Sequence, residues 1–171
     1  MIIWLLGISG SGKTTLGTLL KKRLDAKKVN SFLMDGDTTR DFFDNDLGYS
    51  KEDRIQNIKR ILFAAYALNQ KNIVTIVCNI FPFQELRDFA RAKISDYNEI
   101  YLHKNLNRSL QNDIKNVYRD NMGKTELVGI DIPFDEPIRC DLKVDVDSLT
   151  VEGSLEKINM FLKKKYPFWA L

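Results

Sequence analysis

The segment GISGSGKT, residues 7–14, fits the pattern GxxxxGK[ST] of a phosphate-binding loop. The apolar run IIWLL at residues 2–6 precedes it and is typical of a buried β-strand. The pattern TLGTLLKKRL at residues 15–24 follows it and is typical of a helix. In this order the three pieces form a cradle for phosphate, because backbone N–H groups and the helix N-terminus point at the same anion. The sequence therefore predicts that the chain binds a nucleoside triphosphate.

The residue types within this loop have separate roles in that prediction. Glycines let the backbone wrap closely around an anion. Lys13 would reach the β- and γ-phosphates, and the hydroxyl of Thr14 would hold Mg²⁺. The residues expected to contact the nucleotide are Gly7, Ser9, Gly10, Ser11, Gly12, Lys13, Thr14 and Thr15.

Length and composition fit a single domain over residues 1–171. Hydrophobic residues make up 44% and charged residues 29%, which is ordinary for a globular protein. A net charge of +3 with dispersed basic residues gives no reason to expect nucleic-acid binding. Two cysteines without metal or disulfide spacing suit a reducing cytoplasm. The sequence has no apolar run long enough for a membrane span and no room for a signal peptide before residue 2.

Strand-like and helix-like patterns alternate along the chain, which predicts an α/β fold with a five-stranded parallel sheet covered by helices on both faces. With the loop above, this is the P-loop nucleoside-triphosphate hydrolase fold. A long loop at 121–140 has the length of a lid or binding segment. Strands are expected at 2–6, 31–34, 73–78, 99–102 and 142–146, and helices at 15–24, 52–69, 84–95, 106–120 and 154–165.

A second polar cluster, Asp35-Gly36-Asp37, follows the second expected strand. Neighbouring parallel strands end at one crevice, which places Asp35 and Asp37 beside the phosphates held by Lys13. A carboxylate there can organise Mg²⁺ with Thr14 or accept a proton from an attacking hydroxyl, so the cluster favours a kinase. The NKxD sequence that reads guanine in small GTPases is absent, and the chain is too short for most motor ATPases. The alternative is that the cluster is only a polar turn.

Two further groups are candidates to face a second substrate. Arg54 and Asn57 are three residues apart on an expected helix and therefore share one side of it. A guanidinium there can grip an anion through paired hydrogen bonds, although a solvated helix flank is an equal alternative. Ile80, Phe81 and Pro82 follow the third expected strand and would project into the same crevice, although core packing is the usual role of such residues.

The motifs and their order resemble those of adenylylsulfate (APS) kinases, which transfer the γ-phosphate of ATP to the ribose 3′-hydroxyl of APS. The resemblance covers about residues 2–147. It is carried by GISGSGKTT at 7–15, DGDTTR at 35–40, LGYSKEDRIQNIKR at 47–60, PFQELR at 82–87 and GIDIPFDEP at 129–137.

This resemblance implies that the chain uses ATP and Mg²⁺ and that Asp37 is the general base or the carboxylate that positions the acceptor. It also implies a lid near residues 112–130, in which Lys115 aligns with a lysine of the family, and it is the only ground for expecting a homodimer. With the strand-end residues above, the residues expected to contact a nucleotide acceptor are Asp35, Asp37, Arg40, Tyr49, Arg54, Asn57, Ile80, Phe81, Pro82, Lys115 and Leu127.

Three departures from the family pattern fall on the acceptor side. Phe81 stands where these kinases usually have a serine, and the lid motif reads NDIKNVY at 112–118, without the usual arginine and glycine. The two aromatic residues that clamp the acceptor's adenine are matched only by Tyr49, because Leu127 occupies the second position. Loss of one stacking surface removes roughly 1 kcal/mol, whereas the ATP loop is intact.

These departures favour a kinase whose acceptor is not APS. The cytidine diphosphoramidate kinases of capsule biosynthesis are similar to APS kinases and phosphorylate the 3′-hydroxyl of cytidine 5′-diphosphoramidate, whose smaller base suits Leu127. The alternative is an adenylylsulfate kinase that makes 3′-phosphoadenylylsulfate for sulfate assimilation. A catalytically weak ATP-binding regulator is an alternative of another class, against which the intact Lys13, Thr14 and Asp37 argue.

Overall fold

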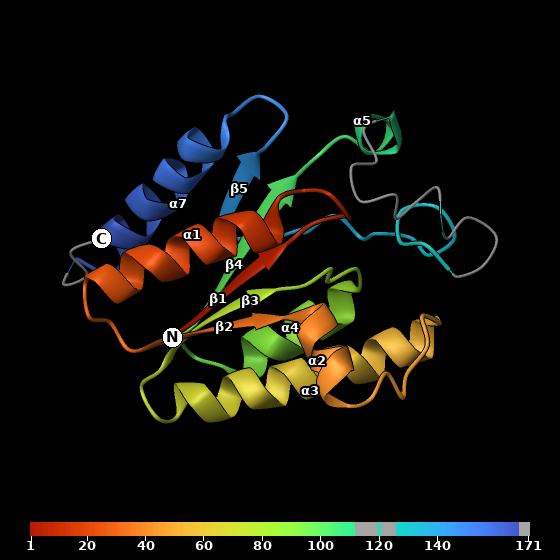
Figure 1. Cartoon of the computed structure of the whole chain (residues 1–171), viewed down its shortest axis with the longest axis horizontal. Coiled ribbons are helices and arrows are strands. Elements are labelled where there is room, and N and C mark those ends of the chain that lie inside the picture. Colours follow the sequence, from red (N-terminus) through yellow and green to blue (C-terminus); the bar gives the residue numbers. More distant parts are fainter. Residues whose placement is uncertain (112–119, 121–125, 168–171) are drawn as a thin grey trace.

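The computed structural model describes residues 1–111, 120 and 126–167. Its centre is a five-stranded sheet in the order β2-β3-β1-β4-β5, in which every neighbouring pair is parallel. The carboxyl ends of the strands point toward the right and the top of Figure 1. The expected α/β fold with a five-stranded parallel sheet is confirmed. The strands are β1 (Ile2–Leu6), β2 (Ser31–Asp35), β3 (Val74–Cys78), β4 (Tyr97–His103) and β5 (Leu142–Asp145).

Helices cover both faces of this sheet (Figure 1). Alternation along β1 divides its fully buried side chains between two cores, since successive residues of a strand point to opposite faces. Ile3 and Leu5 pack with α1 and α7, whereas Ile2, Trp4 and Leu6 pack with α3 and α4. The helices are α1 (Lys13–Ala26), α2 (Gly36–Phe42), α3 (Lys51–Asn69), α4 (Gln84–Lys93), α5 (Leu106–Gln111) and α7 (Val151–Lys165).

The main difference from the expected elements is α2, which begins where a strand end or a turn was expected. Its N-cap is Asp35, whose side chain accepts a hydrogen bond from the N–H of Asp37. Helix α3 begins with a capping residue, since the side chain of Ser50 accepts a hydrogen bond from the N–H of Asp53. The helix expected at 106–120 is described as far as Gln111, and the lid near 112–130 lies mostly outside the described residues.

One close approach holds the phosphate-loop helix against the sheet. Gly17 of α1 is buried over β3, and a Cβ at this position would overlap Sγ of Cys78 and lie 3.2 Å from Cδ1 of Leu33. Sγ of Cys78 also donates a hydrogen bond to the carbonyl of Lys13, at 3.2 Å. The first turn of α1 is therefore fixed relative to the end of β3, which sets where Lys13 can lie.

We expect Gly17→Ala to lower the free energy of unfolding by about 1–3 kcal/mol, the usual effect of overfilling a packed core. Because the overlap is with Cys78, adding Cys78→Ala should recover part of this loss. A double-mutant cycle measured by chemical denaturation checks both statements. Purely additive effects of the two substitutions would contradict the packing described here.

Candidate active site

A pocket of about 360 Å³ lies at the carboxyl ends of the strands, between the phosphate loop, α2, the start of α3 and residues 127–128. It brings together residues from both the expected nucleotide site and the expected acceptor site. The expected residues that line it are Ser9, Gly10, Gly12, Lys13, Thr14, Thr15, Asp35, Asp37, Arg40, Tyr49, Arg54, Asn57, Ile80 and Leu127.

The phosphate loop has the backbone shape that its glycines allow. Gly10 and Gly12 have φ angles of 73° and 84°, in the left-handed region that L side chains rarely adopt. Nζ of Lys13 donates hydrogen bonds to the carbonyls of Gly7 and Ile8, at 3.0 and 2.8 Å, and thus stays at the loop. Gly7 and Ser11 were also expected to contact the nucleotide, but both residues are buried and neither lines the pocket. The loop therefore presents backbone N–H groups and one ammonium to an anion.

Two oxygen ligands suited to Mg²⁺ meet beside this loop. Oγ1 of Thr14 donates a hydrogen bond of 2.8 Å to Oδ2 of Asp35, which joins α1 to the end of β2. A hydroxyl and a carboxylate are the hard oxygen donors that Mg²⁺ prefers, and few protein ligands suffice when phosphate oxygens and water supply the rest. The residues present therefore fit the expected metal position.

The same carboxylate also positions Asp37. The other oxygen of Asp35, Oδ1, accepts a hydrogen bond of 3.0 Å from the N–H of Asp37 and so begins α2 at a defined point. The side chain of Asp37 is exposed at the pocket surface. Asp37 is therefore placed to act on a hydroxyl that enters the pocket beside the phosphates.

Two arginines shape the acceptor side of the pocket around Tyr49. Arg40 is only 7% exposed, and its guanidinium donates to the carbonyls of Leu47 and Gly48, at 2.9 and 2.8 Å. Its guanidinium carbon lies 4.5 Å from the centre of the Tyr49 ring. Both bonds come from Nη1 and hold the loop that carries Tyr49, while Arg40 also lines the pocket. The expected contact of Arg40 with the acceptor stays a prediction.

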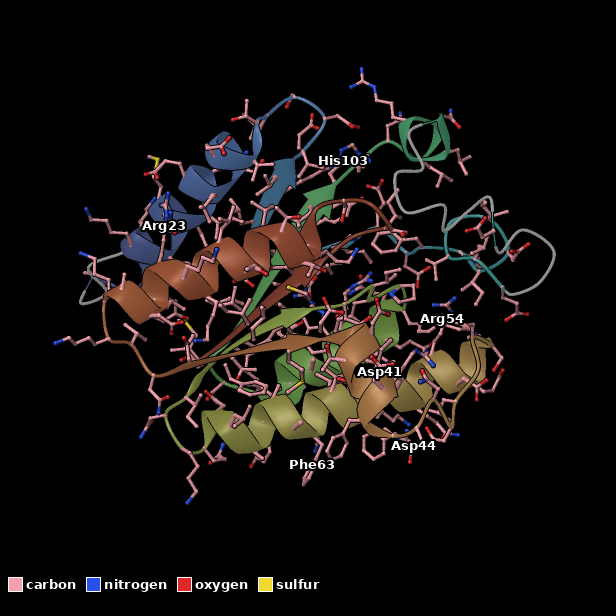
Figure 2. The ribbon with its side chains drawn as sticks, in the orientation of Figure 1. Arg23, Asp41, Asp44, Arg54, Phe63 and His103 are labelled. Atoms are coloured by element: carbon pink, nitrogen blue, oxygen red, sulfur yellow. The ribbon has the colours of Figure 1, made fainter. Side chains whose placement is uncertain are left out.

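Arg54 links the two walls of the acceptor side. It donates to the carbonyls of Tyr49 and Glu126, at 2.9 and 2.6 Å, and Figure 2 shows it beside the segment that begins at residue 126. Burial, and next the positive charge of Arg40, lower the pKa of Arg54 below that of a free guanidinium. Because both effects oppose its positive charge, an anionic substrate group beside Arg54 would be favourable here.

The expectation that Phe81 and Pro82 face the acceptor is wrong. Both are buried away from the pocket, and Phe81 stacks on Trp4 with ring centroids 4.5 Å apart. The buried side chain of Arg87 then donates to the carbonyls of Phe81 and Asp135, which ties residues 81–82 to the loop before β5. Lys115 lies outside the described residues.

The pocket also contains residues that the sequence did not indicate. Gly36, Ile58, Cys78, Asn79 and Val128 complete its lining. Burial raises the pKa of the Cys78 thiol to about 12, so this cysteine is a neutral packing residue at neutral pH. Asn79 follows β3 directly. It belongs to no sequence motif, so the sequence alone could not have identified it as a pocket residue.

Comparison with known proteins agrees with this geometry. Residues 1–145 match the adenylylsulphate kinase family. The chain is 33% identical over 168 residues to an adenylyl-sulfate kinase of Oceanobacillus iheyensis, a match that covers 96% of this chain and 84% of that protein. The chain belongs to the adenylylsulphate kinase family. Another relative, the adenylyl-sulfate kinase of Picosynechococcus, is 35% identical over 158 residues, which cover 91% of this chain and 89% of the relative.

Solved structures of this family have the same fold. The APS kinase of Mycobacterium tuberculosis in complex with AMPPNP and APS matches with a TM-score of 0.87 and 27% identity, over 95% of this chain and 96% of that chain. A hexameric APS kinase from Thiobacillus denitrificans matches with a TM-score of 0.73 and 25% identity, over 96% of this chain but 29% of that chain. The homodimer expected for this chain stays a prediction.

The family gives the class of reaction. The protein is a P-loop kinase, a phosphotransferase that uses ATP with Mg²⁺ and acts on a hydroxyl of a small-molecule nucleotide. Among the residues that the structure describes, no helix is long and apolar enough to cross a membrane.

The bond between Thr14 and Asp35 gives a direct test of the metal position. We expect Asp35→Asn to raise the Mg²⁺ concentration required for half-maximal turnover about 10-fold or more, because the neutral amide is a weaker ligand than the carboxylate. Turnover titrated with Mg²⁺ measures this shift. Asp44→Asn is the matched control, because Asp44 is exposed on the loop after α2 and does not line the pocket (Figure 2). An equal Mg²⁺ requirement in the two variants would remove Asp35 from the metal site.

Proposed function

We propose that the protein transfers the γ-phosphate of ATP to the ribose 3′-hydroxyl of adenylyl sulfate. The observation that carries this proposal is that Lys13 and Thr14 of the phosphate loop line the same pocket as Asp37, Arg54 and Asn57. A donor and an acceptor bound there would meet without an intermediate carrier. The adenylyl-sulfate kinases among the relatives support this acceptor over a cytidine nucleotide.

The chain's own groups divide the work of such a transfer. The ammonium of Lys13 and the N–H groups at the start of α1 stabilise negative charge on the transferred phosphoryl group in the transition state. Asp37 orients the 3′-hydroxyl and accepts its proton, which raises the nucleophilicity of the attacking oxygen. Bound Mg²⁺, held by Thr14 and Asp35, would neutralise charge on the phosphate oxygens. The guanidinium of Arg54 binds the anionic group of the acceptor through charge-assisted hydrogen bonds.

A second acceptor, cytidine 5′-diphosphoramidate, remains a candidate because of Leu127. This residue is 5% exposed and lines the pocket where an aromatic wall would clamp an adenine. Tyr49, which is 43% exposed, is the only aromatic residue among the described residues that line the pocket. A pocket with one aromatic wall depends less on base stacking, which suits a smaller pyrimidine as well as a purine.

ATP consumption with Mg²⁺ and each acceptor at saturation tests the proposal, with the new phosphate located by NMR. We expect turnover of adenylyl sulfate to exceed that of cytidine 5′-diphosphoramidate by at least 10-fold, with the phosphate on the 3′-oxygen. The reverse preference would assign the enzyme to the cytidine acceptor. Tight ATP binding without turnover of either compound would contradict both and favour a nucleotide-binding regulator.

A further inference from the structure

The side-chain amide of Asn79 occupies a place in the pocket that none of the roles above uses. Asn79 follows β3, directly beside the point where β2 passes into α2, since Asp35 and Cys78 are register partners. Its amide faces Gly36, and a Cβ on Gly36 would lie 2.9 Å from Oδ1 and 3.3 Å from Nδ2 of Asn79. Gly36 therefore leaves room for this amide beside the stretch of backbone that joins Asp35 to Asp37.

The amide nitrogen of Asn79 lacks the partner that a buried donor needs. Nδ2 is buried and makes no hydrogen bond to any part of the chain that the structure describes, although Asn79 lines the pocket. A buried N–H without a partner destabilises the protein, so groups of this kind usually have a partner in the working state. Oδ1 of Asn57, a residue that is 3% exposed, is unpartnered in the same way on another wall of the pocket.

We propose that Asn79 binds the acceptor's ribose by donating a hydrogen bond from Nδ2 to the hydroxyl oxygen next to the 3′-oxygen. This inference rests on the proposed function, because it takes a 3′-hydroxyl as the group that Asp37 orients. The position beside Gly36 puts Asn79 at the reacting end of the acceptor, whereas Tyr49 and Leu127 lie where a base would stack. A neutral amide matches a neutral hydroxyl, and the anionic end of the acceptor has Arg54.

The group that Asn79 contacts is then the 2′-hydroxyl, so the enzyme should distinguish ribose from 2′-deoxyribose. With the unaltered enzyme, we expect adenylyl sulfate to have a kcat/KM at least 10-fold above that of its 2′-deoxy analogue. In Asn79→Leu, which keeps the same branching at Cγ without a donor, this ratio should fall to near 1. The KM for ATP should stay unchanged, because in this proposal Nδ2 of Asn79 contacts the acceptor and not ATP.

A matched control and a second variant make the test decisive. Asn30→Leu is the control, because Asn30 is exposed at the amino end of β2, at the opposite end of the sheet from the pocket. It should keep the full preference for ribose. Asn79→Ala repeats the measurement with a smaller side chain, should the leucine prevent folding, and binding of adenylyl sulfate in the presence of AMPPNP gives a readout without turnover.

The outcomes separate this inference from the proposed function. Turnover of adenylyl sulfate with the same ribose preference in Asn79→Leu as in the unaltered enzyme would overturn the role of Asn79 alone. A rise in the KM for ATP, with both acceptors affected equally, would place the amide on the donor and overturn it as well. Absence of turnover and of binding with adenylyl sulfate would overturn the proposed function and, with it, this inference.

Discussion

The carboxylate of Asp35 is the constraint on which the arrangement of the site depends. One of its oxygens accepts from Thr14 of the phosphate loop, and the other accepts from the N–H of Asp37 at the start of α2. A single side chain therefore fixes the relative positions of the phosphate-loop helix α1, the proposed metal position and the carboxylate of Asp37. Such a shared anchor gives the precise geometry that phosphoryl transfer requires, since catalysis there is largely positioning and charge stabilisation.

The donor half and the acceptor half of the pocket differ in how closely they follow the family. The phosphate loop has every residue type that the family motif requires, and its left-handed glycines and close packing on β3 leave little freedom for change. In the acceptor half, Leu127 stands where the family resemblance leads us to expect an aromatic residue, and the amide of Asn79 lies beside Gly36. The fold therefore does not determine which acceptor this enzyme uses. The individual residues that line the acceptor half do.

The sequence was sufficient for the sheet and the loop because both depend on local patterns. Apolar runs predict buried strands, and the spacing of Gly7, Gly12 and Lys13 predicts a phosphate loop. Helix α2 was missed because it begins Gly-Asp-Thr-Thr, residues of low helix propensity, and depends on a cap that only the folded chain shows. Phe81 was misplaced because its partner, Trp4, is distant in sequence. Asn79 has no sequence signal, because its proposed role follows from its position beside Gly36 at the start of α2, which is distant in sequence.

The most direct test of the account is the effect of Asp37→Asn on phosphoryl transfer and on ATP binding in the same preparation. We expect turnover to fall by about 10²- to 10⁴-fold, because the amide cannot accept the proton of the 3′-hydroxyl, while calorimetry gives an unchanged affinity for ATP. Asp41→Asn, an exposed position on the same helix, should leave both quantities unchanged (Figure 2). Turnover of Asp37→Asn equal to that of the unaltered enzyme would contradict the placement of this carboxylate at the centre of the reaction.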